Sequence, residues 1–328
     1  GLDQSIAILT PWFFNNMPNI YYQTTPRPEK VRHLSAIITG HVFETKQTVE
    51  LWDRDRSKVT FIGPGGERSI IVNMARRLHN TPLKMGSLYY SRDKLLSLST
   101  FHCTDYQTLD RENRRIVEKV EAARSLLQEE FPNEGDSVEY YLKHLDNDFV
   151  MYATAARIQI TYRMVRHMLS HEGCHTFLEP MQNSPTARLT IGMKNVQASE
   201  VLEQVLSLFD RYDFNVGRAF LVKFEQGYQE PITIMHFTMA HSSGEKVESD
   251  SISLMRLNKA VRTLGWVDND EYQVFSRDPY NLSINGVNLV RSIANWVHVM
   301  LGKQNAYYYS RHKIFKSLEK YDSLVLGL

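Results

Sequence analysis

The sequence predicts an α+β protein made of two copies of one unit, in which a strand is followed by a helix, a strand hairpin and a second helix. Two kinds of hydrophobic periodicity and their recurrence support this prediction. Apolar and polar residues alternate over 187–193, the period of a strand with one buried face. Over 201–209 the spacing changes to that of an amphipathic helix. The same order of patterns occurs about 130 residues earlier, which indicates an internal repeat.

The later copy is predicted to span residues 185–276. Two strand patterns within 216–240 flank a polar turn and are typical of a hairpin. Ser249 or Ser251 is the expected N-cap of the second helix, because a hydroxyl accepts a hydrogen bond from the free N–H groups of the first turn. Residues 272–275 are expected to form a short closing strand.

The earlier copy is predicted to span residues 58–131. Its first strand begins at Val59 and its first helix covers 71–78. The hairpin follows over 83–103 around a tight turn, and a long charged helix over 109–130 closes the copy. Helices are expected to fill the rest of the chain, as an N-terminal segment (1–57), a linker (132–184) and a C-terminal segment (277–328). The chain starts without methionine and stops inside an apolar run, so we expect a longer natural polypeptide with a downstream region.

Composition excludes several classes of protein. With 38 Lys and Arg against 37 Asp and Glu among 328 residues, the chain has no global positive field for nucleic acid or anionic lipid. Two cysteines, Cys103 and Cys174, are too few for a disulfide scaffold. No run approaches the roughly 18 apolar residues of a membrane span, and no secretory signal is visible. These features predict a soluble, cytoplasmic protein.

Catalytic motifs are not found in the sequence. It has no G-x-G-x-x-G after a strand, no Walker motif, no G-x-S-x-G elbow and no H-E-x-x-H pair, so we expect this segment to be non-catalytic. His167 and His171 share a helix face and, with His175 and Cys174, offer ligand types that zinc accepts. Because Gly173 is expected to end that helix before the third histidine, we predict no metal site.

Two strand-to-helix junctions are the predicted ligand sites. Glycines at such a junction allow a ligand to approach the backbone, and the free N–H groups of the helix start bind carboxylate or phosphate. An ordinary turn explains the same glycines. The equivalent junction in the second copy offers a cation and an amide instead. The candidate ligand-binding residues are Gly63, Gly65, Gly66 and Glu67 in the first copy, and Lys194, Asn195 and Ala198 in the second.

The order β-α-β-β-α-β with a ligand loop after the first strand resembles the ACT type of regulatory domain, which has a ferredoxin-like fold with an antiparallel sheet. The resemblance implies paired modules that bind a small amino acid near the loop. A narrower resemblance, covering most of the chain, is to the N-terminal region of the large NAD-dependent glutamate dehydrogenases. It is carried by residues 11–18 (PWFFNNMP), 31–34 (VRHL), 62–66 (IGPGG), 90–93 (YSRD), 298–307 (HVMLGKQNAY) and 310–311 (SR).

This second resemblance implies a regulatory and assembly segment that senses an amino acid or related metabolite and forms a homo-oligomer. It implies that NAD binds in the downstream catalytic region of the parent enzyme, and that the segment itself holds no cofactor. A purely structural oligomerisation module without a ligand is the alternative. An RNA-binding domain of the RRM type has the same element order, but residues 94–101 and 232–237 lack its aromatic and basic signature.

Overall fold

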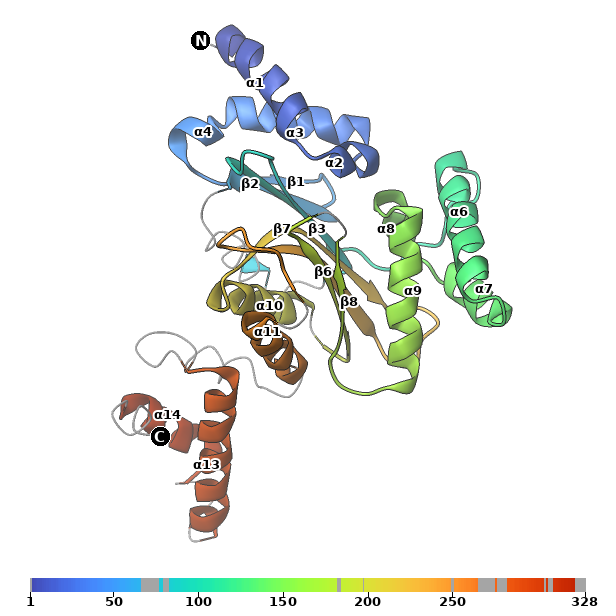
Figure 1. Cartoon of the computed structure of the whole chain (residues 1–328). Helices are drawn as coiled ribbons and strands as arrows, with labels where there is room; N and C mark the ends of the chain where they lie inside the picture. Colours follow the sequence, from blue (N-terminus) through green and yellow to red (C-terminus); the bar gives the residue numbers. More distant parts are fainter. Residues whose placement is uncertain are drawn as a thin grey trace. The chain divides into compact units, whose positions relative to one another are not determined.

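The computed structural model describes residues 2–65, 77–78, 83–181, 184–196, 198–248, 251–264, 275, 282–303, 305 and 309–321. In these residues the protein is α+β, with twelve helices and one eight-stranded antiparallel sheet (Figure 1). The predicted fold class is confirmed at this level. Most of the predicted helix at 71–78 lies outside the described residues.

The sheet contains its strands in the order β1-β2-β4-β3-β7-β8-β6-β5. The two predicted modules therefore share one sheet rather than forming two, because β3 pairs with β7 at their junction. The edge strands β1 and β5 were not predicted. The strands are β1 (Val49–Trp52), β2 (Lys58–Pro64), β3 (Met85–Tyr90), β4 (Leu96–His102), β5 (His175–Pro180), β6 (Ala187–Lys194), β7 (Phe214–Phe224) and β8 (Ile232–His241).

The strand order shows the internal repeat. The first four strands read β1-β2-β4-β3 from one edge, and the last four read β5-β6-β8-β7 from the other. Register agrees with this symmetry, since Ser87 lies opposite Thr100 in the first half and Phe220 lies opposite His236 in the second. Ser87 and Phe220 are themselves paired at the junction. An approximate two-fold axis therefore passes through that pair.

The repeat is longer than predicted, because a pair of helices precedes each half of the sheet. Helices α2 (Asn19–Thr24) and α3 (Arg27–Thr39) lead into β1, and α8 (Asn147–Tyr152) and α9 (Ala155–Ser170) lead into β5. The sequence pattern predicts one helical stretch over 149–169, where the structure has two helices. Thr154 ends the continuity, because its backbone is extended and its hydroxyl caps α9 by accepting from Arg157 N at 3.2 Å.

Both helix pairs cover the same face of the sheet. Around α2 and α3, helices α1 (Leu2–Asn16) and α4 (Val42–Thr45) complete a core that includes Phe13, Tyr21 and Ile37. Around α8 and α9, helices α6 (Arg114–Glu130) and α7 (Gly135–Lys143) complete a second core with Phe220 and Ile234 of the sheet. The predicted charged helix at 109–130 corresponds to α6, which begins five residues later.

The opposite face carries α10 (Ala198–Arg211). His236 of β8 bonds to Thr161 of α9, whereas its neighbour Phe237 packs on Phe209 of α10 with ring centroids 4.9 Å apart. Successive side chains of a strand point to opposite faces, so α9 and α10 lie on different sides of the sheet. The two faces of the sheet, one covered by α9 and the other by α10, therefore form separate environments.

The chain divides into two compact units, residues 1–255 and 256–328. Helix α11 (Ile252–Thr263) begins at the end of the first unit, where Ser251 Oγ accepts from Leu254 N at 3.3 Å, as one of the two predicted caps requires. The second unit contains α13 (Ile284–Gly302) and α14 (Arg311–Lys320). Of the predicted strand at 272–275, only Phe275 is described, and it is helical. No helix in the described parts of the chain is both long and apolar enough to cross a bilayer.

Candidate functional site

A cavity of about 450 Å³ opens on the α10 face of the sheet. It lies where the two halves of the repeat meet. One wall is the β3–β4 turn together with Gly65, and the other is formed by the end of α10, the start of β7 and the end of β8. A cavity of this size accommodates a small metabolite.

Two local features of the sequence shape this cavity. The β3–β4 turn is held by Asp93, whose carboxylate accepts from Leu95 N at 3.1 Å and from Trp12 Nε1 at 2.7 Å. Burial raises the pKa of Asp93, but the hydrogen bond from Ser91 Oγ, followed by those from Leu95 N and Trp12 Nε1, outweighs burial and leaves the pKa below its usual value. On the other wall, the register of β7 shifts between Val216 and Arg218, which marks a bulge at Gly217.

The cavity wall is mainly apolar with charged groups at its rim. Leu206 and Phe209 of α10 contribute apolar surface together with Met239 of β8. Lys94 and Asp210 lie among the lining residues and carry opposite charges. A zwitterion with an apolar side chain matches such a lining, because its carboxylate, its ammonium group and its side chain each find a suitable partner.

The first predicted loop contributes only partly to this cavity. Gly65 lines it, but its N–H donates to Leu95 O at 3.0 Å and is not available to a ligand. A Cβ at Gly65 would lie 2.4 Å from Lys94 O, and one at Gly63 would lie 2.7 Å from Thr48 Oγ1. Close approach to the chain itself therefore explains both glycines. Gly66 and Glu67 lie outside the described residues, and their role stays a prediction.

The second predicted loop is structurally equivalent to the first but does not line the cavity. Asn195 N donates to Pro231 O at 3.0 Å, just as Gly65 N donates across the corresponding hairpin of the first half. Lys194 Nζ lies 2.9 Å from Glu172 Oε1 and 3.5 Å from Glu230 Oε2. The hydrogen bond with Glu172 raises the pKa of Lys194 and neutralises its charge locally. Ala198 is buried at the start of α10.

The histidines form a compact cluster at the end of α9. His167 and His171 stack with ring centroids 4.0 Å apart, and His167 Nε2 lies 2.9 Å from His175 Nδ1. Burial, followed by the two neighbouring imidazoles, lowers the pKa of His167. Within the described residues, no group of three or more His, Cys, Asp and Glu side chains has the arrangement of a metal site. Cys174 is buried beside the cluster.

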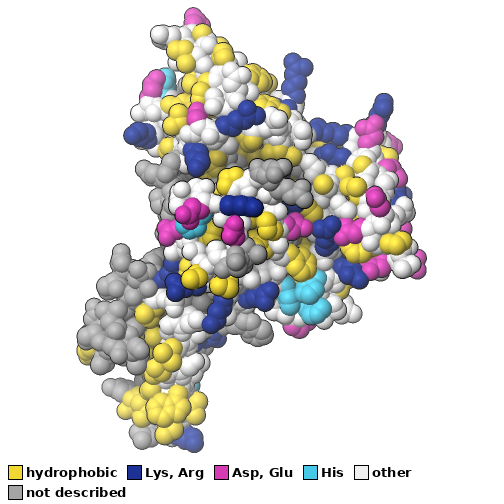
Figure 2. Space-filling view, viewed as in Figure 1, with side chains coloured by type: hydrophobic (Ala, Val, Ile, Leu, Met, Phe, Trp, Pro, Cys, Tyr) yellow, Lys and Arg dark blue, Asp and Glu magenta, His cyan; other side chains and the backbone are white. Residues whose placement is uncertain are grey.

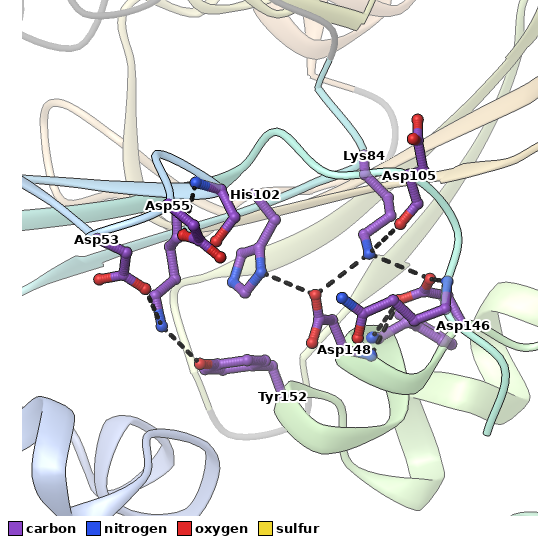
Figure 3. A network of polar contacts seen from close by, with 12 residues as sticks. Asp53, Asp55, Lys84, His102, Asp105, Asp146, Asp148 and Tyr152 are labelled. Atoms are coloured by element: carbon purple, nitrogen blue, oxygen red, sulfur yellow. Dashed lines mark hydrogen bonds and ion pairs between the residues drawn. The ribbon is translucent and has the colours of Figure 1, made fainter. Parts of the chain in front are cut away.

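A second polar feature lies on the face of the sheet that is covered by α3, α8 and α9, which we call the helical face. It forms where α8 meets the start of β3 and the end of β4 (Figure 3). Lys84 is 8% exposed, and its Nζ lies 3.2 Å from both Asp146 Oδ2 and Asp148 Oδ2. His102 Nδ1 lies 3.1 Å from Asp148 Oδ2. Burial raises the pKa of Asp148, but the bonds and charges of His102 and Lys84 lower it to about 2.

Next to this group, Lys58 Nζ lies 2.5 Å from Glu29 Oε1 and 3.4 Å from Asp53 Oδ2. Tyr152 OH donates to Glu29 Oε1 at 2.5 Å. Every charge here has an opposite charge within reach, so the network anchors α3 and α8 to the sheet and leaves no charge for a ligand. We assign it a structural role.

Comparison of the sequence with protein-family models and with curated proteins finds no match. The molecule is therefore defined by its own architecture, an α+β protein in which two related halves share one antiparallel sheet and enclose a cavity at their junction. Sequence reasoning missed most of the cavity, since its walls come from segments more than 100 residues apart. The only local signal is Gly217 inside a strand pattern, which is typical of a bulge.

Proposed function

We propose that this chain is a regulatory segment that binds a small amino acid or a related metabolite in the cavity between its two halves. The observation that carries the proposal is the cavity itself, which is mostly apolar, has charges of both signs and is bordered by Gly65 of a predicted ligand loop. The ligand carboxylate lies toward Lys94, and its ammonium group lies toward Asp210. Its side chain packs on Leu206 and Phe209.

The proposed modules are variants of the ACT topology. The second half contains β6, α10, β7 and β8 in that order after the edge strand β5, and the first half contains β2, β3 and β4 after the edge strand β1. Most of the helix predicted between β2 and β3 lies outside the described residues. Ligand binding at a junction between paired modules is what the resemblance implies. Gly65 and Asn195 then support the hairpin of each module through their N–H groups, and the missing side chain of Gly65 lets the β3–β4 turn approach the first loop.

Regulation follows from the position of the cavity. A ligand that contacts both halves favours the arrangement of the halves that forms the cavity. It shifts the equilibrium between this arrangement and another only to the extent that its affinities for the two differ. In the proposed parent, a large NAD-dependent glutamate dehydrogenase of the cytoplasm, the segment holds no cofactor and NAD binds in the downstream catalytic domain. This segment is then non-catalytic and acts on that domain through packing.

The partner surface is proposed on α13. Trp296, Val299 and Met300 are 66, 59 and 54% exposed, and Figure 2 shows hydrophobic side chains gathered over this helix. Large apolar side chains grouped on a helix are typical of a protein–protein contact. A second subunit or the catalytic domain fits this face. If the cavity binds nothing, this surface supports the alternative, an oligomerisation module without a ligand.

Calorimetric titration of the chain with the common amino acids tests the proposal. A Cβ at Gly217 would meet only Thr238 O, at 3.7 Å, so the variant Gly217→Leu places its side chain in the cavity without a backbone clash. We expect one binding site in the wild type and none in this variant. Gly135→Leu is the matched control, because nothing lies within 4 Å of a Cβ there and α7 is remote from the cavity. Absence of any heat across the panel, or equal binding by Gly217→Leu, contradicts the proposal.

A further inference from the structure

The approximate two-fold axis creates two equivalent positions on the helical face of the sheet. In the first half, Lys58 lies opposite His102, which lies opposite Met85. In the second half, a row in the same register runs from Arg188 through Thr238 to Arg218. Each row lies beneath the start of a helix, α3 in the first half and α9 in the second. The two rows can therefore be compared residue by residue.

The first position is neutral because acidic side chains from the chain itself reach it. Lys58 pairs with Asp53 at the end of β1 and with Glu29, the third residue of α3. Tyr152 adds a hydroxyl to the same carboxylate. Arg32 pairs with Asp53 as well, so two cations balance two carboxylates and the position needs no further ion.

The second position keeps one of these acids and loses the other. Arg188 Nη1 lies 3.3 Å from Glu179 Oε2, which corresponds to the pair between Lys58 and Asp53. The third residue of α9 is Arg157, where α3 has Glu29. Arg218 takes the place of Met85. Three guanidinium groups and one carboxylate therefore occupy a position that in the other half holds two cations, Lys58 and Arg32, and two carboxylates.

Among the residues that the structure describes, several of these guanidinium N–H groups have no hydrogen-bond acceptor. Arg157 Nη1 and Arg218 Nε and Nη2 are shielded from solvent without a hydrogen-bond acceptor. In the described part of the chain, no carboxylate forms an ion pair with either side chain. Arg157 lies 4.5 Å from the centroid of the Phe220 ring and Arg218 lies 5.7 Å from that of Tyr89. Such contacts engage the flat face of a guanidinium, so the N–H groups at its edge still need acceptors.

The electrostatics agree with an uncompensated site. Burial, followed by the charge of Arg218, holds the pKa of Arg157 well below its ordinary value. Burial and the same arginines hold the pKa of His236 well below its ordinary value, and its two ring nitrogens already contact Thr161 and Thr190. Arginine keeps its proton in proteins, so Arg157 and Arg218 stay positive, and no carboxylate among the described residues pairs with either of them.

We propose that the face of the sheet under the start of α9 binds an oxyanion, a phosphate or carboxylate group, between Arg157, Arg188 and Arg218. The planar guanidinium fork matches two oxygens of such a group, which supplies the acceptors that the edge N–H groups lack. The oxyanion takes the role that the Glu29 carboxylate has in the other half. This site is on the opposite face of the sheet from the α10 cavity and is independent of the function proposed for it.

Thermal unfolding of the full chain at constant ionic strength tests the proposal, with sodium phosphate and sodium succinate as probes and sodium chloride as the reference. At about 100 times the Kd, we expect the midpoint to rise by roughly 5 °C above that in chloride. Calorimetry with each probe gives the stoichiometry, which we expect to be one. A response to phosphate alone identifies a phosphate site, and a response to succinate alone identifies a carboxylate site. No response to either probe overturns the proposal.

Two substitutions introduce residues of the neutral position in the first half at the equivalent places of the charged position in the second half. Arg157→Glu restores the missing carboxylate and Arg218→Met reproduces Met85. We expect both variants to lose the anion response, and we expect Arg157→Glu to be at least as stable as the wild type in chloride. Arg114→Gln is the control, because Arg114 is 90% exposed and bonds only to Glu118 on its own helix. A wild-type response in Arg157→Glu and Arg218→Met, or its loss in Arg114→Gln, refutes the site. Gly217→Leu, which fills the α10 cavity, is expected to keep the anion response.

Discussion

Lys84 gives the sharpest test of how the helical layer is attached to the sheet. Its ammonium group lies between the carboxylates of Asp146 and Asp148 and donates to Asp105 O at 3.0 Å. Lys84→Met keeps most of the apolar stem but leaves two carboxylates close together at a site where Lys84 is 8% exposed. The substitution therefore removes the charge with little change in packing.

The structure sets the expected magnitude. Removing one partner of a buried ion pair costs about 3–5 kcal/mol, because the other charge remains buried without compensation. Here the carboxylates keep other donors. His102 remains beside Asp148, and Asp146 still accepts from Gln107 N at 2.7 Å and caps α8. We therefore expect a loss near the lower end of that range, about 3 kcal/mol in the free energy of unfolding.

Urea unfolding monitored by circular dichroism at pH 7 and pH 4 measures this loss, with Lys143→Met, an exposed lysine on α7, as the control. In the wild type the pKa of Asp148 is about 2 against 3.8 for the free side chain, so its contribution is present above pH 4 and is lost as pH falls toward 2. Without Lys84 the pKa of Asp148 rises, so lowering the pH from 7 to 4 reduces the unfolding free energy of the variant less than that of the wild type. The difference between the two proteins should therefore shrink by about 1 kcal/mol at pH 4. A loss below 1 kcal/mol at pH 7, or an equal loss at both pH values, refutes the reasoning.

Three further outcomes are expected. Gly192→Val should cost about 1–3 kcal/mol in urea unfolding, because a Cβ there lies 2.6 Å from Met164 Sδ, and adding Met164→Ala should recover part of the loss. Burial lowers the pKa of His33 from 6.5 to about 4, so the free energy of unfolding should fall by on the order of 3 kcal/mol as the pH decreases from 6.5 to 4. The variant His33→Gln should show a weaker pH dependence, and an unchanged pH profile contradicts the prediction. Thr154→Ala should cost about 0.5–2 kcal/mol by removing the cap of α9, whereas Thr154→Ser should preserve most of the stability.

Local periodicity was enough to predict six of the eight strands of the sheet and most of the long helices. The pattern at 187–193 lies within β6 and the one at 201–209 lies within α10, because each element buries one face against a neighbour and its apolar residues follow that face. Elements that bury little were missed. Strand β1 has only four residues, none fully buried, so its alternation is too short to detect.

The junction of the two halves could not be predicted from the sequence. Pairing of β3 with β7 joins Met85 to Val222, and no local pattern indicates which edge strands meet. The cavity depends on that pairing. The cluster of arginines depends on other long-range contacts, within the second half. Arg157, Arg188 and Arg218 are each flanked by ordinary helix or strand patterns. The register of β6, β8 and β7 and the packing of α9 on these strands bring them together.

The repeat gives this molecule an internal reference that single-copy folds lack. Equivalent backbone positions experience similar sheet geometry and helix placement, so a difference in charge between them is a difference in side chains alone. Glu29 and Arg157 stand at the same place in their helices, yet Glu29 completes a neutral network, whereas Arg157 adds charge to a cluster in which Glu179 is the acceptor of Arg188 alone among the three arginines, within the described residues. An uncompensated buried cation costs stability unless a ligand is present. An anion should therefore increase stability most when it binds in the second half, where the arginines lie. Exchanging the two residues, Glu29→Arg with Arg157→Glu, should move the anion response to the first half of the sheet.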